Sequence, residues 1–491
     1  MAKLRINNFF LYRRRYAISF VVIGILLALI ILAVSFLSPG GISKAEMQSA
    51  VTSTYTQPKA LMGQSPENII HLPYRLFQKL SLAALDVNLI SIKLPSLVLA
   101  VGSVLALYGL LRLWFRRNVA VITATIVVAT GQFLLLSQLG TPAIGYIFWN
   151  SAILYCVSML ARTEKFRPLW FITATIFAAL SMYSPLQLYV VIALIAACFF
   201  HPHARFVVFR QSKWVLGTGG LLFLLLITPL VISLTKQPAL IKTLLGIPPQ
   251  LSMINLELVQ TQLSQYAGFY KSSSDVRITP AYGLGVIALA LVGLGKLFTT
   301  KYTAKSYFIT VWFILLLPAV LINPDAVMVT FVPVVLLVAY GVDYLIRSWY
   351  RLFPHNPYAR VFGLAPLSVL VIGLIISGGE RFLYGYHYDP QASNVFTSDL
   401  AMLDKTVDTY RGKTVSLVVP EDQRDFYTIY AMRKNVQPKL IVHSAAPSAP
   451  TDVVLYHRGS SAIRPQNPSK ILVSAVSNDA DRFYLYKKPT K

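Results

Sequence analysis

The sequence predicts an all-α polytopic membrane protein that carries a small α/β domain at its C-terminal end. The mean hydropathy of the 491 residues is +0.60, and only 13% of them are charged. Apolar runs of about twenty residues alternate with short basic clusters, and each run is long enough to cross the ~30 Å hydrocarbon core of a bilayer. The acidic residues gather near the C-terminus, where the apolar runs stop. A soluble globular fold and a disordered chain are both excluded by this composition.

The apolar runs predict about eleven transmembrane helices. The first, Ala17–Leu37, follows the basic segment LYRRRY and is longer than the ~7–15 residues of a signal-peptide core, so we expect an uncleaved anchor. Ten further runs begin near Leu94, Val119, Ala143, Leu169, Leu186, Val215, Ala281, Ser306, Ala326 and Val361. Cys156 and Cys198 both fall inside such runs, which supports neither a disulfide framework nor a cysteine metal site.

The basic residues predict the orientation of the chain. Of the 29 Lys and Arg residues before Glu380, 20 fall in the segments that face the cytoplasm if the N-terminus is inside, and the other nine lie in two long outer loops, about 38–93 and 235–280. Lys and Arg are retained on the cytoplasmic side, and the rule weakens in long loops. We therefore predict a multi-pass cell-membrane protein with a cytoplasmic N-terminus and an extracytoplasmic C-terminal domain. The net charge of +25 comes from these clusters and forms no nucleic-acid-binding patch.

The composition changes after Gly379, so we divide the chain into a transmembrane domain, 1–379, and a soluble domain, 380–491. Eleven of the 19 acidic residues lie in the last 112 positions. The runs TVSLVVP, PKLIVHS, DVVLYHR, KILVSAV and RFYLYKK read as strands, and SDLAMLDKTVDTY and EDQRDFYTIYAMRK read as helices. A small α/β fold follows.

The first outer loop holds the acidic residue of greatest interest. Ser43-Lys-Ala-Glu46 is a capping-box pattern at the start of a predicted helix, EMQSAVTSTY, and helix capping is one explanation of Glu46. The next stretch, SPENIIHLPYRLFQKLSLAAL, is amphipathic and is expected to lie along the membrane interface. No acidic or basic residue before Glu380 lies in the middle of a predicted span, which argues against an ion-coupled transporter.

Several segments resemble the polytopic glycosyltransferases of the C-type membrane fold (GT-C), in particular family 39, the protein O-mannosyltransferase and aminoarabinose-transferase group. ISKAEMQSA is similar to the acidic motif that follows the family's first span, and IIHLPYRLFQKLSLAALDVN is similar to its interfacial helix. SIKLPSLVLAVGSVLALYGLLRLWF resembles the opening of its second span, with Lys93 where the family usually has Arg. The family's usual Asp-Glu pair is Ala45-Glu46 in this chain.

The resemblance implies an inverting transfer of a hexose or pentose from a polyprenyl-phosphate carrier to a glycan, lipid or protein acceptor at the outer face of the membrane. An attacking hydroxyl needs a general base, and a departing phosphate needs cations. Glu46 is the candidate base. The candidate phosphate ligands are Lys44, Arg75, Lys93, Lys242, Lys271 and Arg277. Some relatives use a divalent cation, so this cofactor stays open here, although a lone carboxylate gives only weak support for a dedicated metal site.

Three interpretations stay open at this point. The first is an active lipid-linked glycosyltransferase. The second is a non-catalytic relative that binds or assembles envelope glycans and lipids, and the third is a transporter of lipid-linked intermediates. The environment of Glu46 separates the first two, because a base must face a cavity whereas a capping residue need not.

Overall fold

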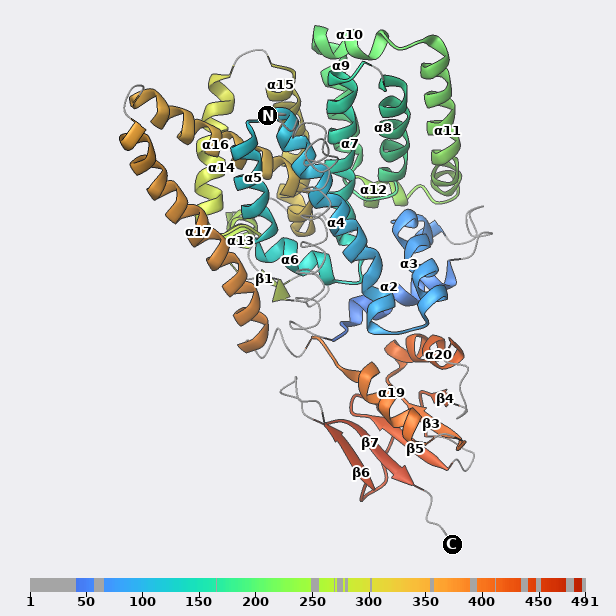
Figure 1. Cartoon of the computed structure of the whole chain (residues 1–491). Helices are drawn as coiled ribbons and strands as arrows, with labels where there is room; N and C mark the ends of the chain where they lie inside the picture. The colour runs from blue at the N-terminus through green and yellow to red at the C-terminus, as the bar shows by residue number, and fades with distance from the viewer. Residues whose placement is uncertain are drawn as a thin grey trace, which may run out of the picture.

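The computed structural model of the chain describes residues 41–56, 66–164, 166–248, 256–268, 270–271, 277–278, 281–300, 303–353, 357–388, 395–410, 412–433, 440–446, 452–473 and 481–487. A bundle of helices forms most of the protein, and a sheet domain lies below it in Figure 1. The mainly helical architecture and the small C-terminal sheet confirm the predicted fold class.

Six of the described helices are long and apolar enough to cross a membrane. They are α4 (Leu89–Trp114), α7 (Gly145–Arg162), α11 (Lys213–Lys236), α15 (Ala304–Ile322), α16 (Phe331–Leu352) and α17 (Pro357–Tyr388). Two consecutive pairs are sharply bent, α5 (Arg117–Val128) with α6 (Gly131–Gln138) by 64° and α9 (Leu188–Phe200) with α10 (Pro202–Phe209) by 98°. Two shorter apolar helices are α8 (Arg167–Ser181) and α14 (Leu284–Thr299).

Each of the ten apolar runs predicted after residue 90 contains one of these helices. By length and composition the described residues provide six spans, or up to eight if each bent pair is one span. The predicted number of eleven is therefore not confirmed, and the first predicted span, Ala17–Leu37, lies outside the described residues.

Small residues allow close helix packing in the bundle. A Cβ atom on Gly293 of α14 would lie 1.8 Å from the carbonyl oxygen of Leu337 in α16, and one on Gly341 would lie 2.2 Å from the carbonyl oxygen of Leu289. These two glycines let the backbones of α14 and α16 meet, as small residues do at many membrane-helix interfaces.

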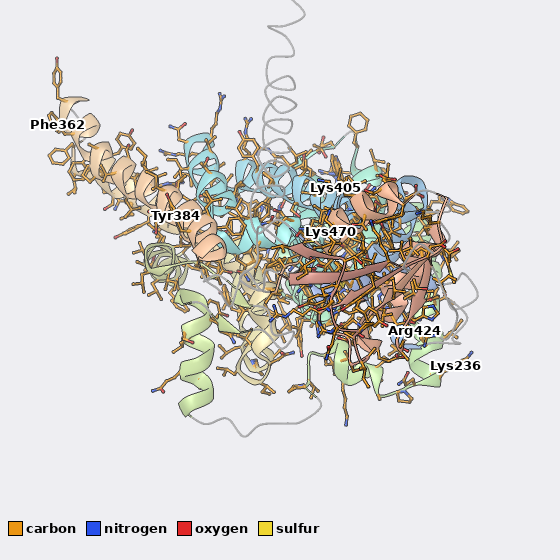
Figure 2. The ribbon with its side chains drawn as sticks, turned by 90° about the horizontal axis from the view of Figure 1, so that it is seen from below. Lys236, Phe362, Tyr384, Lys405, Arg424 and Lys470 are labelled. Carbon is orange, nitrogen blue, oxygen red and sulfur yellow. The ribbon has the colours of Figure 1, made fainter. Side chains whose placement is uncertain are left out.

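Helix α17 has an exposed apolar face. It extends past the sheet domain in Figure 2, and Phe362 and Tyr384 on it are 78% and 55% exposed. Such an apolar face suits contact with lipid.

The segments between the bundle and the sheet domain are short. They comprise α2 (Lys44–Tyr55), η3 (Pro66–Ile69), α3 (Leu72–Leu85), η4 (Pro142–Ile144), α12 (Leu240–Leu244), α13 (Leu256–Ala267), the hairpin β1 (Tyr270–Lys271) and β2 (Arg277–Ile278), and η5 (Pro324–Thr330). In Figure 1, α2 and α3 lie directly above the sheet domain.

The C-terminal domain contains α19 (Asp399–Thr409), β3 (Val415–Val418), η6 (Glu421–Gln423), α20 (Arg424–Arg433), β4 (Leu440–His443), β5 (Val453–His457), β6 (Lys470–Val473) and β7 (Asp481–Lys487). The strand order is β4-β3-β5-β7-β6, with β3 parallel to β4 and β5, and β7 antiparallel to β5 and β6. All five predicted strands and both predicted helices are present. Helix α20 makes the crossover between the parallel strands β3 and β4.

The sheet domain shares a hydrophobic core with α2 and α3. Met47 of α2 and Leu82 of α3 belong to the same buried cluster as Phe426 and Tyr430 of α20. The segment before α2 also joins the domain, because the amides of Ile42 and Thr397 each donate to the other's carbonyl oxygen at 2.9 Å. The sequence boundary at 379/380 falls inside α17, which continues to Tyr388. Independent folding of 380–491 stays a prediction.

Candidate functional site

Glu46 closes the capping box that the sequence predicts at the start of α2. Its Oε2 accepts hydrogen bonds from the Ser43 amide at 2.8 Å and the Ser43 hydroxyl at 2.9 Å, and the Ser43 hydroxyl accepts from the Glu46 amide at 3.3 Å. The side chain has 0% exposure. The Glu46 carboxylate therefore satisfies the Ser43 amide at the helix start and is shielded from solvent.

The other carboxylate oxygen of Glu46 reaches two distant segments. Its Oε1 accepts a hydrogen bond from the Gly140 amide at 2.7 Å, and the Nζ of Lys93 lies 3.8 Å away. A Cβ on residue 140 would lie 2.6 Å from Ile92 Cγ2 and 2.9 Å from the Ile92 carbonyl oxygen, so the turn approaches α4 as closely as only glycine permits. Glu46 thus joins α2, the turn before η4 and the start of α4.

Gln78 of α3 is a second buried connector, and no sequence motif marks it. Its Oε1 accepts from the hydroxyls of Ser49 at 2.9 Å and Ser53 at 2.7 Å, while its Nε2 donates to the carbonyl oxygens of Ile92 at 3.1 Å and Gly140 at 3.0 Å. All its hydrogen-bonding capacity is used. The available signal was one polar side chain on the apolar face of the predicted interfacial helix.

Lys93 is the most unusual of the predicted phosphate ligands. It is the fifth residue of α4, its side chain is 3% exposed, and within the described residues its Nζ has no hydrogen-bond partner. A buried ammonium normally needs partners for its protons, and at 3.8 Å the Glu46 carboxylate compensates the charge without a hydrogen bond. Among the described residues the three donors of Lys93 are thus unused.

The other predicted cations are scattered over several elements. Lys44 pairs with Asp422 of the C-terminal domain at 3.0 Å and is exposed. Arg75 is half-buried on α3, donates to Asn68 Oδ1 at 3.3 Å, and has its pKa lowered by burial to about 10, so it stays charged at neutral pH. Lys242 is exposed on α12. Lys271 and Arg277 are paired across the β1–β2 hairpin, and the structure describes only their backbone.

Hydrogen bonds of His71 connect the turn before α3 with the turn after α8. The His71 amide donates to the Tyr183 carbonyl oxygen at 2.8 Å, and its Nδ1 lies 3.2 Å from the Ser184 hydroxyl. Burial, followed by the charge of Arg75, lowers the pKa of His71 to about 3. The imidazole is therefore neutral at physiological pH. Among the described residues, no group of three or more His, Cys, Asp or Glu could hold a metal ion.

The fold matches that of solved membrane glycosyltransferases. ArnT from Cupriavidus metallidurans bound to undecaprenyl phosphate aligns over 95% of this chain and 98% of its own, with 11% identity and a TM-score of 0.51. The apo form of the same ArnT aligns over 96% of this chain and 98% of its own, with 11% identity and a TM-score of 0.52. The protein has the GT-C fold. The oligosaccharyltransferase from Archaeoglobus fulgidus tethered with an acceptor peptide aligns over 86% of this chain and 64% of its own, with 11% identity and a TM-score of 0.51.

The sequence likeness to a family covers one part of the chain. The family described as dolichyl-phosphate-mannose-protein mannosyltransferase matches residues 73–232. The matched segment includes Arg75 and Lys93 and begins after Glu46. No curated protein sequence matches the chain.

Proposed function

We propose that the protein moves a sugar from a polyprenyl-phosphate carrier to an acceptor at the outer face of the cytoplasmic membrane. The GT-C fold and the family match over residues 73–232 support a transferase of this class. ArnT, which has the same fold, binds undecaprenyl phosphate in one of its structures. The observation that carries the proposal is the buried Lys93 ammonium beside Glu46, with no hydrogen bond of its own in the described structure.

In this proposal Lys93 binds the carrier phosphate and Glu46 is the general base. A cation near the leaving phosphate stabilises charge that grows in the transition state. The base must come within hydrogen-bond reach of the acceptor hydroxyl. Among the described residues Oε1 of Glu46 accepts one hydrogen bond, from the Gly140 amide, and keeps a second lone pair for the acceptor hydroxyl. Because Glu46 is fully buried, the segments around it must move before the acceptor can reach that oxygen. Arg75 is the second cation that binds the phosphate in this proposal.

A second candidate function is a non-catalytic relative that binds lipid-linked glycans or assists envelope assembly. The observation that favours it is the complete burial of Glu46, with hydrogen bonds to both oxygens. In that case the Glu46–Lys93 pair positions α2 and α4 and takes no part in proton transfer. Sugar release from the carrier by the purified protein separates the two candidates.

The role of Lys93 is tested by measuring the affinity of purified protein in nanodiscs for undecaprenyl phosphate. Lys93→Met removes the charge, and loss of a charged hydrogen bond of about 1.5–3 kcal/mol weakens binding roughly 10- to 100-fold. Lys79→Met is the matched control, because the amine of Lys79 donates to the Thr56 carbonyl oxygen. Since Lys93→Met leaves a buried carboxylate unpaired, the double variant Lys93→Met/Glu46→Gln is measured too. Wild-type affinity in a folded double variant would exclude Lys93 from the phosphate site.

The role of Glu46 is tested by the rate of undecaprenyl-phosphate release from a panel of undecaprenyl-phosphate sugars. Gln has one carbonyl oxygen, so in Glu46→Gln either the Gly140 or the Ser43 amide loses its acceptor, at a cost of about 1–3 kcal/mol in stability. Loss of a base slows turnover by about 10²–10⁴-fold. A folded Glu46→Gln protein with the wild-type rate contradicts the base role. If wild type releases no sugar while binding the carrier, the non-catalytic function is the correct one.

A further inference from the structure

A cavity lies at the end of the bundle that faces away from the sheet domain. Its volume is about 320 Å³, and it lies among the ends of α4, α7, α9, α10 and α15. Helix α10 turns by 98° from α9 and crosses this end of the bundle, as the top of Figure 1 shows. Apolar side chains such as Leu154, Leu194 and Val207 form most of the wall.

Two cations accompany the apolar wall. Lys305, at the start of α15, and Arg162, at the end of α7, both line the cavity and are close enough to interact electrostatically. The Lys305 ammonium donates to the Trp114 carbonyl oxygen at 3.1 Å and lies 5.4 Å from the centroid of the Trp114 ring. The ring is held by a hydrogen bond from its Nε1 to the Ser158 hydroxyl at 2.7 Å. Trp114 thus fixes Lys305 at the cavity.

No carboxylate of the described residues forms an ion pair with either cation. Glu164, two residues after Arg162, lies 3.3 Å from Arg167 and 3.5 Å from Arg210. Asp343 pairs with Arg347 at 2.8 Å. A single Lys or Arg at a helix end commonly extends to the membrane surface, but two neighbouring cations on one apolar cavity form a site with both charge and shape.

We propose that this cavity binds an anionic phospholipid of the leaflet opposite the sheet domain, which the basic-residue distribution predicts to be cytoplasmic. The lipid phosphate lies between Arg162 and Lys305, and an acyl chain occupies the apolar cavity. Basic pockets between transmembrane helices bind anionic lipid head groups in this way. The apolar wall argues for a lipid over free phosphate, since free phosphate gains nothing from apolar surface.

Native mass spectrometry of delipidated full-length protein tests the proposal. Phosphatidylglycerol should bind at least 10-fold more tightly than phosphatidylethanolamine with the same chains, and glycerol phosphate should not compete. In Arg162→Gln/Lys305→Gln this preference should disappear. The matched control is Arg116→Gln/Lys213→Gln, which removes two exposed cations from the same end of the bundle. It should keep the preference within twofold.

Two further measurements make each outcome decisive. Ala204→Phe, which places a ring in the cavity, should weaken phosphatidylglycerol binding without changing the charge. If the double variant does not fold, the single variants Arg162→Gln and Lys305→Gln are measured instead, each with an expected loss of at least threefold. The proposal would be overturned if the wild-type protein bound the two lipids equally. It would also be overturned if Arg116→Gln/Lys213→Gln lost as much of the lipid preference as Arg162→Gln/Lys305→Gln, or if glycerol phosphate competed with phosphatidylglycerol.

Discussion

A buried carboxylate must have both oxygens paired, and Glu46 finds its partners in three segments of the chain. The Ser43 contacts are local, so the S-x-x-E pattern alone predicts them. The Gly140 and Lys93 contacts join residues 94 and 47 positions away, and no local pattern predicts them. The sequence therefore predicted that Glu46 caps α2 and could not predict that its Oε1 is also occupied.

At the residue scale, His71 predicts a pH dependence of stability. Its pKa is lowered from 6.5 to about 3 in the folded protein, so the unfolded chain binds more protons between these values and the free energy of unfolding falls as the pH falls below 6.5. The slope from this group is at most about 1.4 kcal/mol per pH unit. His71→Asn tolerates the positive φ of 58° and should have a shallower slope in denaturation by SDS between pH 7.5 and 5.

Ser184→Ala is the control for that measurement. It removes the hydroxyl 3.2 Å from His71 Nδ1 but leaves the imidazole in place, so the wild-type slope should remain. Equal slopes in wild type and His71→Asn would show that this imidazole does not titrate with unfolding.

Apolar periodicity in the sequence predicts where the helices lie, but it does not predict the bend between α5 and α6. GQFLLLSQ continues the apolar pattern of α5, yet α6 departs from it by 64°. At this point α17 crosses so closely that a Cβ on Gly378 would lie 2.2 Å from the Ala129 carbonyl oxygen. That contact joins residues far apart in the chain, and hydropathy cannot report it. The bend before α10, in contrast, has a local signal in Pro202 at the first position of the helix.

At the element scale, α14 offers a matched pair of glycines. Gly293 has no room for a Cβ against α16, while nothing lies within 4 Å of a Cβ on Gly295. Gly293→Ala should reduce the free energy of unfolding by about 1–3 kcal/mol through overpacking. Gly295→Ala should leave it unchanged or raise it by up to about 1 kcal/mol, because Ala is the better helix former. Thermal denaturation in detergent measures both, and equal effects would contradict the close α14–α16 contact.

The whole molecule is organised around the junction between the α2–α3 segment and the sheet domain. Arg433 of α20 donates to the Leu82 carbonyl oxygen at 3.0 Å, and Lys44 pairs with Asp422. Together with the shared buried cluster, these contacts hold the sheet domain next to the Glu46–Lys93 pair. Strand and helix patterns predicted the domain's elements. Docking depends on side chains more than 350 positions apart, which periodicity cannot connect.

At the scale of the whole molecule, the prediction is that the C-terminal domain is extracytoplasmic. The two positions that test it lie at opposite ends of the structure: Ser461 is exposed in the sheet domain, and His203 is exposed on α10. In a background without Cys156 and Cys198, Ser461→Cys should react with a membrane-impermeant maleimide on intact cells. His203→Cys should react only after permeabilisation, because the 20-to-9 distribution of basic residues places its loop inside. Both variants must react in detergent, which controls for local accessibility, and the reverse pattern on intact cells would invert the topology and move the Glu46–Lys93 site to the cytoplasmic face.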